Sequence, residues 1–312
     1  MSRSLSDLGE SELIAFLSDL LPSAPGVRIG IGDDAAVVAG TGDRELVLTS
    51  DAVIEGVHFT PEDPAGSVGH KTIARVLSDF AAMGADPAWG LIDLVAPGNQ
   101  SVDYVESLYR GVAATSSAHG FHVVGGDCAR GEPLSIHCFG AGTVPPGRAL
   151  PRSGVCQGDI LFVTGELGGS GAGGHLSFAP RLREGRWLRE SGMVTSMIDV
   201  SDGLATDATH LARAGGVVIE VRAADLPASK EAQRAVGGRT KIEHVLYDGE
   251  DFELLFTVCP DAAADLLDVW SSVFSTRLTG IGHCGSGPDG VVLVHENGSR
   301  EELAPGGFDH FS

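Results

Sequence analysis

The chain has 312 residues, which is the length of two ordinary domains or one large one. Hydrophobic residues make up 43% of it and charged residues 20%, a balance that excludes disorder over most of the chain. With 42 acidic against 21 basic residues the net charge is −21, and so acidic a protein is unsuited to binding the phosphate backbone of nucleic acids.

Hydrophobic periodicity predicts alternating helices and strands in the first half of the chain. The predicted helices span residues 6–21, 68–83 and 101–119, with Gly84 as the C-cap of the second. The predicted strands span residues 35–38, 45–49, 89–95, 121–124 and 134–144. Pro145-Pro146-Gly147, followed by Pro151 and Gly154, is typical of a boundary between domains.

The same alternation resumes after this boundary. One helix is predicted at residues 204–214, and strands are predicted at residues 159–164, 197–200, 217–221, 252–258 and within 278–295. The pattern therefore indicates two α/β or α+β domains, residues 1–146 and 147–312.

The cysteines and the apolar runs indicate which kinds of site and which cellular location to expect. Five cysteines, an odd number with no C-x-x-C pair, support neither a disulfide framework nor a zinc site. The apolar stretch 13–21 is interrupted by Ser18 and Asp19, so it does not resemble a signal peptide. No apolar run approaches the roughly 20 residues that a membrane-spanning helix needs. We therefore expect a cytoplasmic protein with no membrane partner.

Four short acidic motifs lie where a predicted strand meets a loop. They are Gly30-Ile31-Gly32-Asp33-Asp34, Thr49-Ser50-Asp51, Gly125-Gly126-Asp127 and Asp199-Val200-Ser201-Asp202-Gly203. A fifth carboxylate, Asp79, lies in an apolar helix, where it is costly unless it is bound or exposed. Each motif alone is typical of a turn or a cap, but the recurrence of five favours a metal site.

Magnesium is the metal that this pattern favours. It prefers hard oxygen ligands, usually one or two carboxylates together with water and substrate phosphates. Transfer of a phosphoryl group from ATP needs the positive charge of metal ions to offset the negative charge of the triphosphate. The glycines beside these aspartates would let backbone amides approach phosphate oxygens. No Walker motif and no protein-kinase signature occurs, which excludes those two classes. The glycine-rich segment 168–174 is either a phosphate-binding loop or a flexible linker.

Six motifs, which include or extend those above, carry a family resemblance. They are Gly30-Ile31-Gly32-Asp33-Asp34, the segment from Thr49-Ser50-Asp51 to His58-Phe59, Leu77–Pro87, Gly125-Gly126-Asp127, Ile198–Leu204 and Gly249–Leu254. In this order they resemble thiamine-monophosphate kinase, of the aminoimidazole ribonucleotide synthetase-like superfamily of ATP-binding enzymes. The segment Ser78–Pro87 is shared with other members of that superfamily, whereas the motifs of His58, Asp199–Gly203 and Glu250 favour the thiamine enzyme.

The resemblance implies direct in-line transfer of the ATP γ-phosphoryl group to thiamine monophosphate, with several Mg²⁺ ions. It also implies a homodimer in which the mixed sheet of the N-terminal domain joins that of its partner, while a C-terminal α/β domain completes the nucleotide site. The implied magnesium ligands are Asp34, Thr49, Ser50, Asp51, Asp79, Asp127, Asp199 and Asp202. The implied ATP contacts are Gly126, Asp127, Arg152 and Ser201. No general base is assigned, because a phosphate monoester is largely ionised near neutral pH.

Three further residues are implied to contact thiamine phosphate: His58, Glu250 and Phe308. Glu250 would balance the thiazolium charge or accept a hydrogen bond from the aminopyrimidine, and Phe308 would stack on a ring. The alternatives are a histidine that only satisfies its own turn and a phenylalanine that only packs in the core.

The chain departs from the family pattern between Leu176 and Met197, which is short and keeps only Ala179-Pro180-Arg181 of an expected Arg-Pro-x-Pro-Arg ending. We expect most of one helix to be missing there. Two other functions stay open: another ATP-dependent enzyme of the same superfamily, and a non-catalytic descendant that binds a nucleotide or a metal.

Overall fold

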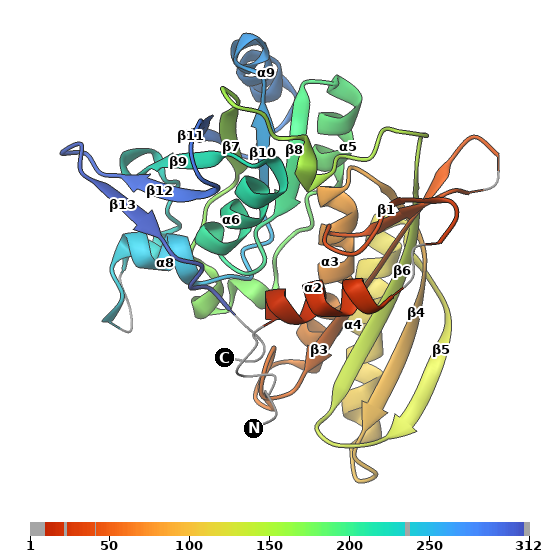
Figure 1. The fold of residues 1–312 in the computed structure, drawn as a ribbon. Helices are drawn as coiled ribbons and strands as arrows, with labels where there is room; N and C mark the ends of the chain where they lie inside the picture. Colours follow the sequence, from red (N-terminus) through yellow and green to blue (C-terminus); the bar gives the residue numbers. More distant parts are fainter. Residues whose placement is uncertain (1–9, 22–23, 41, 235–237, 309–312) are drawn as a thin grey trace.

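The computed structural model describes residues 10–21, 24–40, 42–234 and 238–308 (Figure 1). They form two mixed α/β units, each built on its own sheet. The strand order is β1-β2-β3-β6-β4-β5 in the first sheet and β13-β12-β9-β11-β7-β10-β8 in the second. The predicted fold class, two domains of mixed α/β structure, is confirmed.

The first sheet is covered on one face by two long helices. Its strands are β1 Val27–Ile29, β2 Ala36–Val38, β3 Glu45–Ile54, β4 Asp86–Ala96, β5 His122–Arg130 and β6 Ser135–Val144. The helices of this unit are α2 Glu10–Leu20, α3 Ala65–Ala82 and α4 Val102–His119. Helices α3 and α4 pack unusually closely, because a Cβ on Gly111 would come within 2.0 Å of the carbonyl oxygen of Gly66.

The second sheet has helices on both faces. Its strands are β7 Ile160–Thr164, β8 Val194–Asp199, β9 Val218–Arg222, β10 Leu254–Val258, β11 Leu278–Gly285, β12 Gly290–Val294 and β13 Arg300–Leu303. The helices are α5 Leu182–Ser191, α6 Leu204–Gly215, α7 Lys230–Gln233, α8 Lys241–Tyr247 and α9 Pro260–Val273. Alternate residues of β7 face opposite cores: Leu161 and Val163 pack with α6, and Phe162 packs with α5 and α9.

Helix α3 ties the two units together. Its Ala81 and Ala82 belong to the core around α5 and α9, while its Phe80 and Leu77 belong to the core of the first sheet. A Cβ on Gly185 of α5 would come within 2.2 Å of the carbonyl oxygen of Ala81. This close approach places one face of α3 against the second domain, beside the end of β8.

Several predicted boundaries are wrong, and two of them matter for function. Strand β3 extends to Ile54 and pairs with β6 along its whole length, so Thr49-Ser50-Asp51 lies inside a strand. Gly125-Gly126-Asp127 likewise lies inside β5, which pairs with β4. The prediction that every motif sits at a strand end is therefore wrong, because pairing with distant strands supplies the backbone partners that local sequence does not reveal.

Other elements were not predicted at all: β1, α7, α8, α9 and β13. The first predicted helix is confirmed from Glu10 onward, and its residues 6–9 lie outside the described residues. The segment thought to lack most of a helix contains α5, whose Leu188 is fully buried. The boundary at residue 146 stays a prediction and falls between the last strand of the first sheet and the first strand of the second. Among the described helices, none has the length and apolar character to cross a bilayer.

Candidate active site

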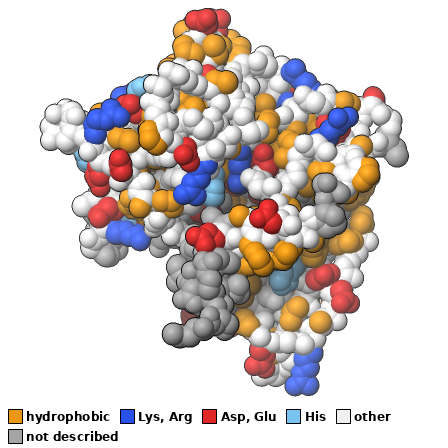
Figure 2. All heavy atoms as spheres, viewed as in Figure 1, with side chains coloured by type: hydrophobic (Ala, Val, Ile, Leu, Met, Phe, Trp, Pro, Cys, Tyr) orange, Lys and Arg blue, Asp and Glu red, His pale blue; other side chains and the backbone are white. Residues whose placement is uncertain are grey.

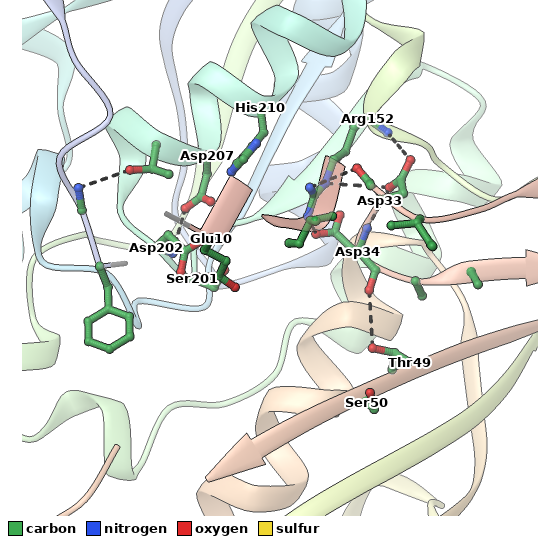
Figure 3. Close-up of a pocket in the computed structure, with 18 of the residues that line it drawn as sticks. Glu10, Asp33, Asp34, Thr49, Ser50, Arg152, Ser201, Asp202, Asp207 and His210 are labelled. Atoms are coloured by element: carbon green, nitrogen blue, oxygen red, sulfur yellow. Dashed lines mark hydrogen bonds and ion pairs between the residues drawn. The ribbon is translucent and has the colours of Figure 1, made fainter. Parts of the chain in front are cut away.

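A cleft of about 770 Å³ opens between the two domains. Figure 3 shows its walls: the loop of Asp33 and Asp34, strand β3, the 3-10 turn that begins at Arg152, and helix α6. The implied site residues that line it are Asp34, Thr49, Ser50, Arg152, Ser201, Asp202 and Phe308. Residues of the first and second domains thus face one another across a single cleft.

Four buried or half-buried aspartates lie close to one another, each on a different element, and of these Asp34 lines the cleft. Asp34 comes from the loop before β2, Asp51 from β3, Asp79 from α3 and Asp199 from the end of β8. Thr49 Oγ1 donates a hydrogen bond to Asp79, and Ser78 Oγ donates one to Asp199. The second of these bonds joins the two domains.

The aspartates repel one another in the absence of a cation. Burial, and then repulsion by Asp51 and Asp199, raises the pKa of Asp79 well above its usual value. Burial and the charge of Asp34 raise the pKa of Asp199 to about 7. Burial also raises the pKa of Asp202 to about 6. Carboxylates crowded in this way are stabilised when a cation joins them.

Arg152 offsets part of this charge at the rim. Its Nη2 forms an ion pair with Asp34, its backbone amide donates to Asp33 Oδ2 at 3.1 Å, and its Nη1 donates to the carbonyl of Gly32 at 3.3 Å. Asp34 Oδ2 is buried and has no hydrogen-bond partner within the described residues. A buried carboxylate oxygen is costly when unpartnered, so this atom fits a metal ligand.

Asp202 also belongs to a second group of side chains whose geometry would allow them to bind a metal ion. Potential ligand atoms of Asp202, Asp207 and His210 all lie within 4.8 Å of one another. Asp207 is buried, and its Oδ2 accepts a hydrogen bond from the amide of Asp202 at 3.1 Å. Burial, helped by the charge of Arg152, lowers the pKa of His210 to about 4, so its imidazole is neutral near pH 7. Sequence reasoning missed Asp207 and His210, although their spacing from Asp202 on the first turns of α6 was a usable signal.

A smaller pocket of about 120 Å³ adjoins the cleft and shares Ser201, Asp202 and Phe308 with it. His58 and Glu250, which are both implied to contact thiamine phosphate, line this pocket. The structure therefore brings the three implied substrate contacts together. The ring centroids of His58 and Phe308 lie 6.3 Å apart.

The two alternatives for His58 and Phe308 have different outcomes. His58 Nδ1 accepts a hydrogen bond from the amide of Ile54 at 3.1 Å, so His58 does satisfy its turn while it also lines the pocket. Phe308 is 44% exposed at the pocket rim, so simple core packing is wrong for this residue.

Glu250 lies on a strained loop that is fastened to the motif of Asp199 and Asp202. Glu250 and Phe252 have φ angles of 55° and 52°, a left-handed conformation that costs free energy outside glycine. The amide of Glu250 donates to the carbonyl of Ser201 at 2.7 Å, and that of Phe252 donates to Val200 at 2.8 Å. These bonds fix the smaller pocket relative to the metal candidates.

The glycine-rich loop does not present a free phosphate cradle. The amides of Gly168 and Gly169 donate to the carboxylate of Asp251, at 2.9 and 3.2 Å. Burial raises the pKa of Asp251 to about 7. The loop therefore holds the chain's own anion, which fixes the segment that follows Glu250.

Comparison with known proteins places the chain in a family. It matches the two domains of the AIR synthase related proteins, the N-terminal domain at residues 32–144 and the C-terminal domain at residues 179–295. It is 34% identical to the thiamine-monophosphate kinase of Escherichia coli strain K12, over 97% of this chain and 98% of that protein. The thiamine-monophosphate kinase of Aquifex aeolicus is also 34% identical, over 98% of this chain and 99% of that protein. The chain belongs to the thiamine-monophosphate kinase family.

Solved structures agree with this placement. A structure of AaThiL complexed with AMPPCP and TMP superposes with a TM-score of 0.86 at 32% identity and covers 99% of both chains. HypE of E. coli, a hydrogenase maturation protein, has a TM-score of 0.73 at 22% identity, over 86% of this chain and 88% of its own. The latter likeness concerns the fold alone.

Two residues implied by the thiamine-monophosphate kinase family stand apart from the rest. Gly126 and Asp127 lie on β5, an edge strand of the first sheet whose residues are almost all exposed. Neither lines the cleft or the smaller pocket. Strands β6 and β4 separate β5 from β3, which carries Asp51. One chain therefore brings together the other implied residues without these two.

Proposed function

We propose that this chain transfers the γ-phosphoryl group of ATP to thiamine monophosphate and so forms thiamine diphosphate and ADP. The observation that carries the proposal is the convergence of buried aspartates from both domains beside two adjoining pockets. The larger pocket suits ATP, and the smaller one suits the phosphate end of thiamine monophosphate. Because both pockets include Ser201 and Asp202, the two substrates would meet at these residues.

The residues present fit magnesium. The candidate ligands are oxygen donors throughout: the carboxylates of Asp34, Asp51, Asp79, Asp199 and Asp202 with the hydroxyls of Thr49 and Ser50. Magnesium held there would neutralise charge on the triphosphate and on the phosphoryl group during transfer. Asp34 Oδ2, which has no hydrogen-bond partner among the described residues, and the raised pKa values of Asp79 and Asp199 all support such an occupant.

The chain's own groups would position the two anions. Arg152, held by Asp33 and Asp34, places a permanent positive charge beside the ATP cleft. The acceptor phosphate needs no strong base, since its second pKa is about 6. Alignment of the acceptor oxygen with the γ-phosphorus would therefore supply most of the acceleration, together with charge stabilisation.

We also propose a homodimer built on the uncovered face and the exposed edge of the first sheet. Large apolar side chains project from this face: Leu48, Trp89, Leu91 and Phe139 are 40–51% exposed, and Leu48 and Phe139 also line one wall of the cleft. Register places Leu91 directly opposite Phe139 on neighbouring strands, so they form one patch. Hydrophobic side chains gather over this sheet and α2 in the view of Figure 2. An exposed apolar patch beside an unpaired strand edge is typical of an interface.

The dimer would also give Asp127 its role. Because Gly126 and Asp127 lie on the exposed edge strand β5, each chain would present them to its partner. We infer that the partner subunit's Asp127 completes the ATP and magnesium site. This assignment explains how Asp127 could be a magnesium ligand although two strands separate it from Asp51 within one chain.

The decisive experiment is direct. The protein is incubated with ATP and Mg²⁺ and with thiamine monophosphate, thiamine or aminoimidazole precursors in turn, and products are separated by chromatography. Thiamine diphosphate together with ADP is expected from thiamine monophosphate alone. ADP release with no thiamine diphosphate would reject this function in favour of another ATP-dependent reaction, and no ADP from any compound would favour a non-catalytic descendant.

A further inference from the structure

Arg75 lies in the middle of a charged stripe on α3. Lys71, Arg75 and Asp79 are spaced four residues apart, so they project from the same face of the helix. Lys71 reaches Glu250 in the smaller pocket, and Asp79 belongs to the buried aspartates. Arg75 therefore stands between the pocket for thiamine phosphate and the candidate metal site.

Two carboxylates hold the guanidinium of Arg75. Nη2 lies 2.9 Å from Asp51 Oδ1, and Nη1 lies 3.2 Å from Glu250 Oε1. Its Cζ lies 5.8 Å from the ring centroid of Phe252, which is within the range of a cation–π contact. The side chain is only 12% exposed, so the guanidinium is held in a fixed position within the site and is largely shielded from solvent.

One donor of Arg75, its Nε, stands out for its hydrogen bonding. Its Nε is buried and lacks a hydrogen-bond partner in the part of the chain that the structure describes. A buried N–H group without an acceptor costs free energy, and the cost is larger for a charged group. Arg75 also lines the smaller pocket, so a bound anion there is within reach of its guanidinium.

Glu250 does not depend on Arg75 for its counter-charge. Lys71 Nζ lies 2.7 Å from Glu250 Oε1 and 2.9 Å from Oε2, and the side chain of Lys71 is fully buried. Lys71 also donates to the carbonyl of His58 at 2.7 Å, which fixes its position. Arg75 is therefore able to turn toward another anion while Glu250 stays paired.

We propose that Arg75 binds the phosphate of thiamine monophosphate and holds it beside the γ-phosphate of ATP; this inference rests on the proposed function. The guanidinium is planar, permanently charged and carries a fork of donors that matches phosphate oxygens. The pocket of about 120 Å³ has room for a phosphate group, since a water molecule takes about 30 Å³. Two anions must meet for the transfer, and a fixed cation between them reduces their repulsion.

The test compares binding of the two substrates to wild type and to Arg75→Met, with Arg75→Lys as a second variant. Calorimetry measures the Kd for thiamine monophosphate and, separately, the Kd for the non-hydrolysable analogue AMPPCP, both with Mg²⁺. We expect Arg75→Met to weaken thiamine monophosphate about 10- to 100-fold, the range for losing a charge-assisted hydrogen bond, and to leave AMPPCP within about twofold. The control is Arg110→Met, which removes an exposed arginine of α4 paired with Glu106 and should match wild type.

Steady-state kinetics provides a second readout. Arg75→Met should raise the KM for thiamine monophosphate and lower kcat, with little change in the KM for ATP. Arg75→Lys keeps the charge but loses the fork, so it should fall between wild type and Arg75→Met in both measurements. If Arg75→Met fails to fold, Arg75→Lys decides, and it should still weaken only thiamine monophosphate.

Two results would overturn the assignment. One is an unchanged affinity for thiamine monophosphate in a folded variant, and the other is an equal loss for both ligands, which would indicate a structural role. Failure of the proposed function is a separate result, because it would appear in the wild type as binding of thiamine monophosphate without formation of thiamine diphosphate. The binding comparison between wild type and Arg75→Met would still decide the role of Arg75.

Discussion

Ser78 Oγ donates a hydrogen bond to Asp199 Oδ2, and through this contact α3 of the first domain holds the last residue of β8 in the second. Both side chains are buried. The bond therefore fixes a candidate metal ligand of one domain against the helix that carries Asp79, a ligand candidate of the other.

Replacement of Ser78 by alanine should loosen this junction. It leaves Asp199 with one hydrogen-bond donor fewer, so we expect the free energy of unfolding to fall by about 1–3 kcal/mol. Chemical denaturation without Mg²⁺ measures this change. The matched control is Ser116→Ala, since Ser116 is a buried serine on α4 whose Oγ has no hydrogen-bond partner within the described residues. Equal losses in the two variants would argue against a specific role for the Ser78 contact.

Asp51 is the carboxylate that links β3 to Arg75 and to the buried aspartates. Asp51→Ala should abolish turnover, with kcat lower by on the order of 100-fold or more, because charge stabilisation of the transferred group is lost. The assay is formation of thiamine diphosphate at saturating Mg²⁺. Asp265→Ala on the exposed side of α9 serves as the control. Near-normal activity of Asp51→Ala would rule out the metal assignment of this residue.

The crowded aspartates make the stability of the metal-free protein depend on pH. Burial and mutual repulsion raise the pKa of Asp199 to about 7 and that of Asp79 well above its usual value. The native state therefore holds protons that the unfolded state has lost, so its stability falls as pH rises through the folded pKa. The pKa of His210 is lowered to about 4, so this residue makes the native state more stable as pH rises, but only up to about pH 6.5, the pKa of an unperturbed histidine.

We accordingly expect the Tm in EDTA to fall as the pH rises from about 6.5, where His210 no longer opposes the trend, to about 7, where Asp199 has lost its proton in the folded state. Added Mg²⁺ should raise the Tm more at the upper end of this range, where the carboxylates are ionised. Asp199→Asn removes one titrating group and should flatten the dependence. A Tm in EDTA that climbs across the same range would contradict this account of the cluster.

The uncovered face of the first sheet should hold the dimer together. Leu91→Asp and Phe139→Asp each place a charge in the apolar patch, where burial against a partner would be costly. We expect both variants to elute as monomers in size-exclusion chromatography with light scattering, whereas wild type elutes as a dimer. Val102→Asp, at an exposed position that begins α4, is the control. A wild type that is monomeric at all concentrations would refute the dimer.

If each active site combines Asp51 of one chain with the partner subunit's Asp127, two inactive variants should restore one another. Asp51→Ala and Asp127→Ala are each expected to lack activity alone. Mixing them after reversible dissociation should regain activity, because half of the sites in a mixed dimer carry both aspartates. No recovery in dimers proven to be mixed would place both residues in the same chain's site.

Much of this architecture is predictable from local patterns. The helical spacing that ends near Met83 and the alternation along 134–144 correspond to α3 and β6, because burial of one face imposes a period on the sequence. The recurring aspartate–glycine motifs indicated magnesium, since the ligand chemistry of that ion is carried by the residue type itself. Asp34, Asp199 and Asp202 could thus be named before any contact was known.

Only the tertiary structure decided which of these residues meet. Strands β3 and β5 run through two of the motifs that were expected at strand ends. Asp79 and Asp199 come from different domains and lie close together, whereas Asp127 lies on an exposed edge strand. The tertiary structure also revealed Arg75, which has no motif of its own and gains its place from the four-residue spacing to Lys71 and Asp79. Strand pairing and domain packing depend on contacts between residues far apart in the chain, so neither can be deduced from the local pattern around any one of them.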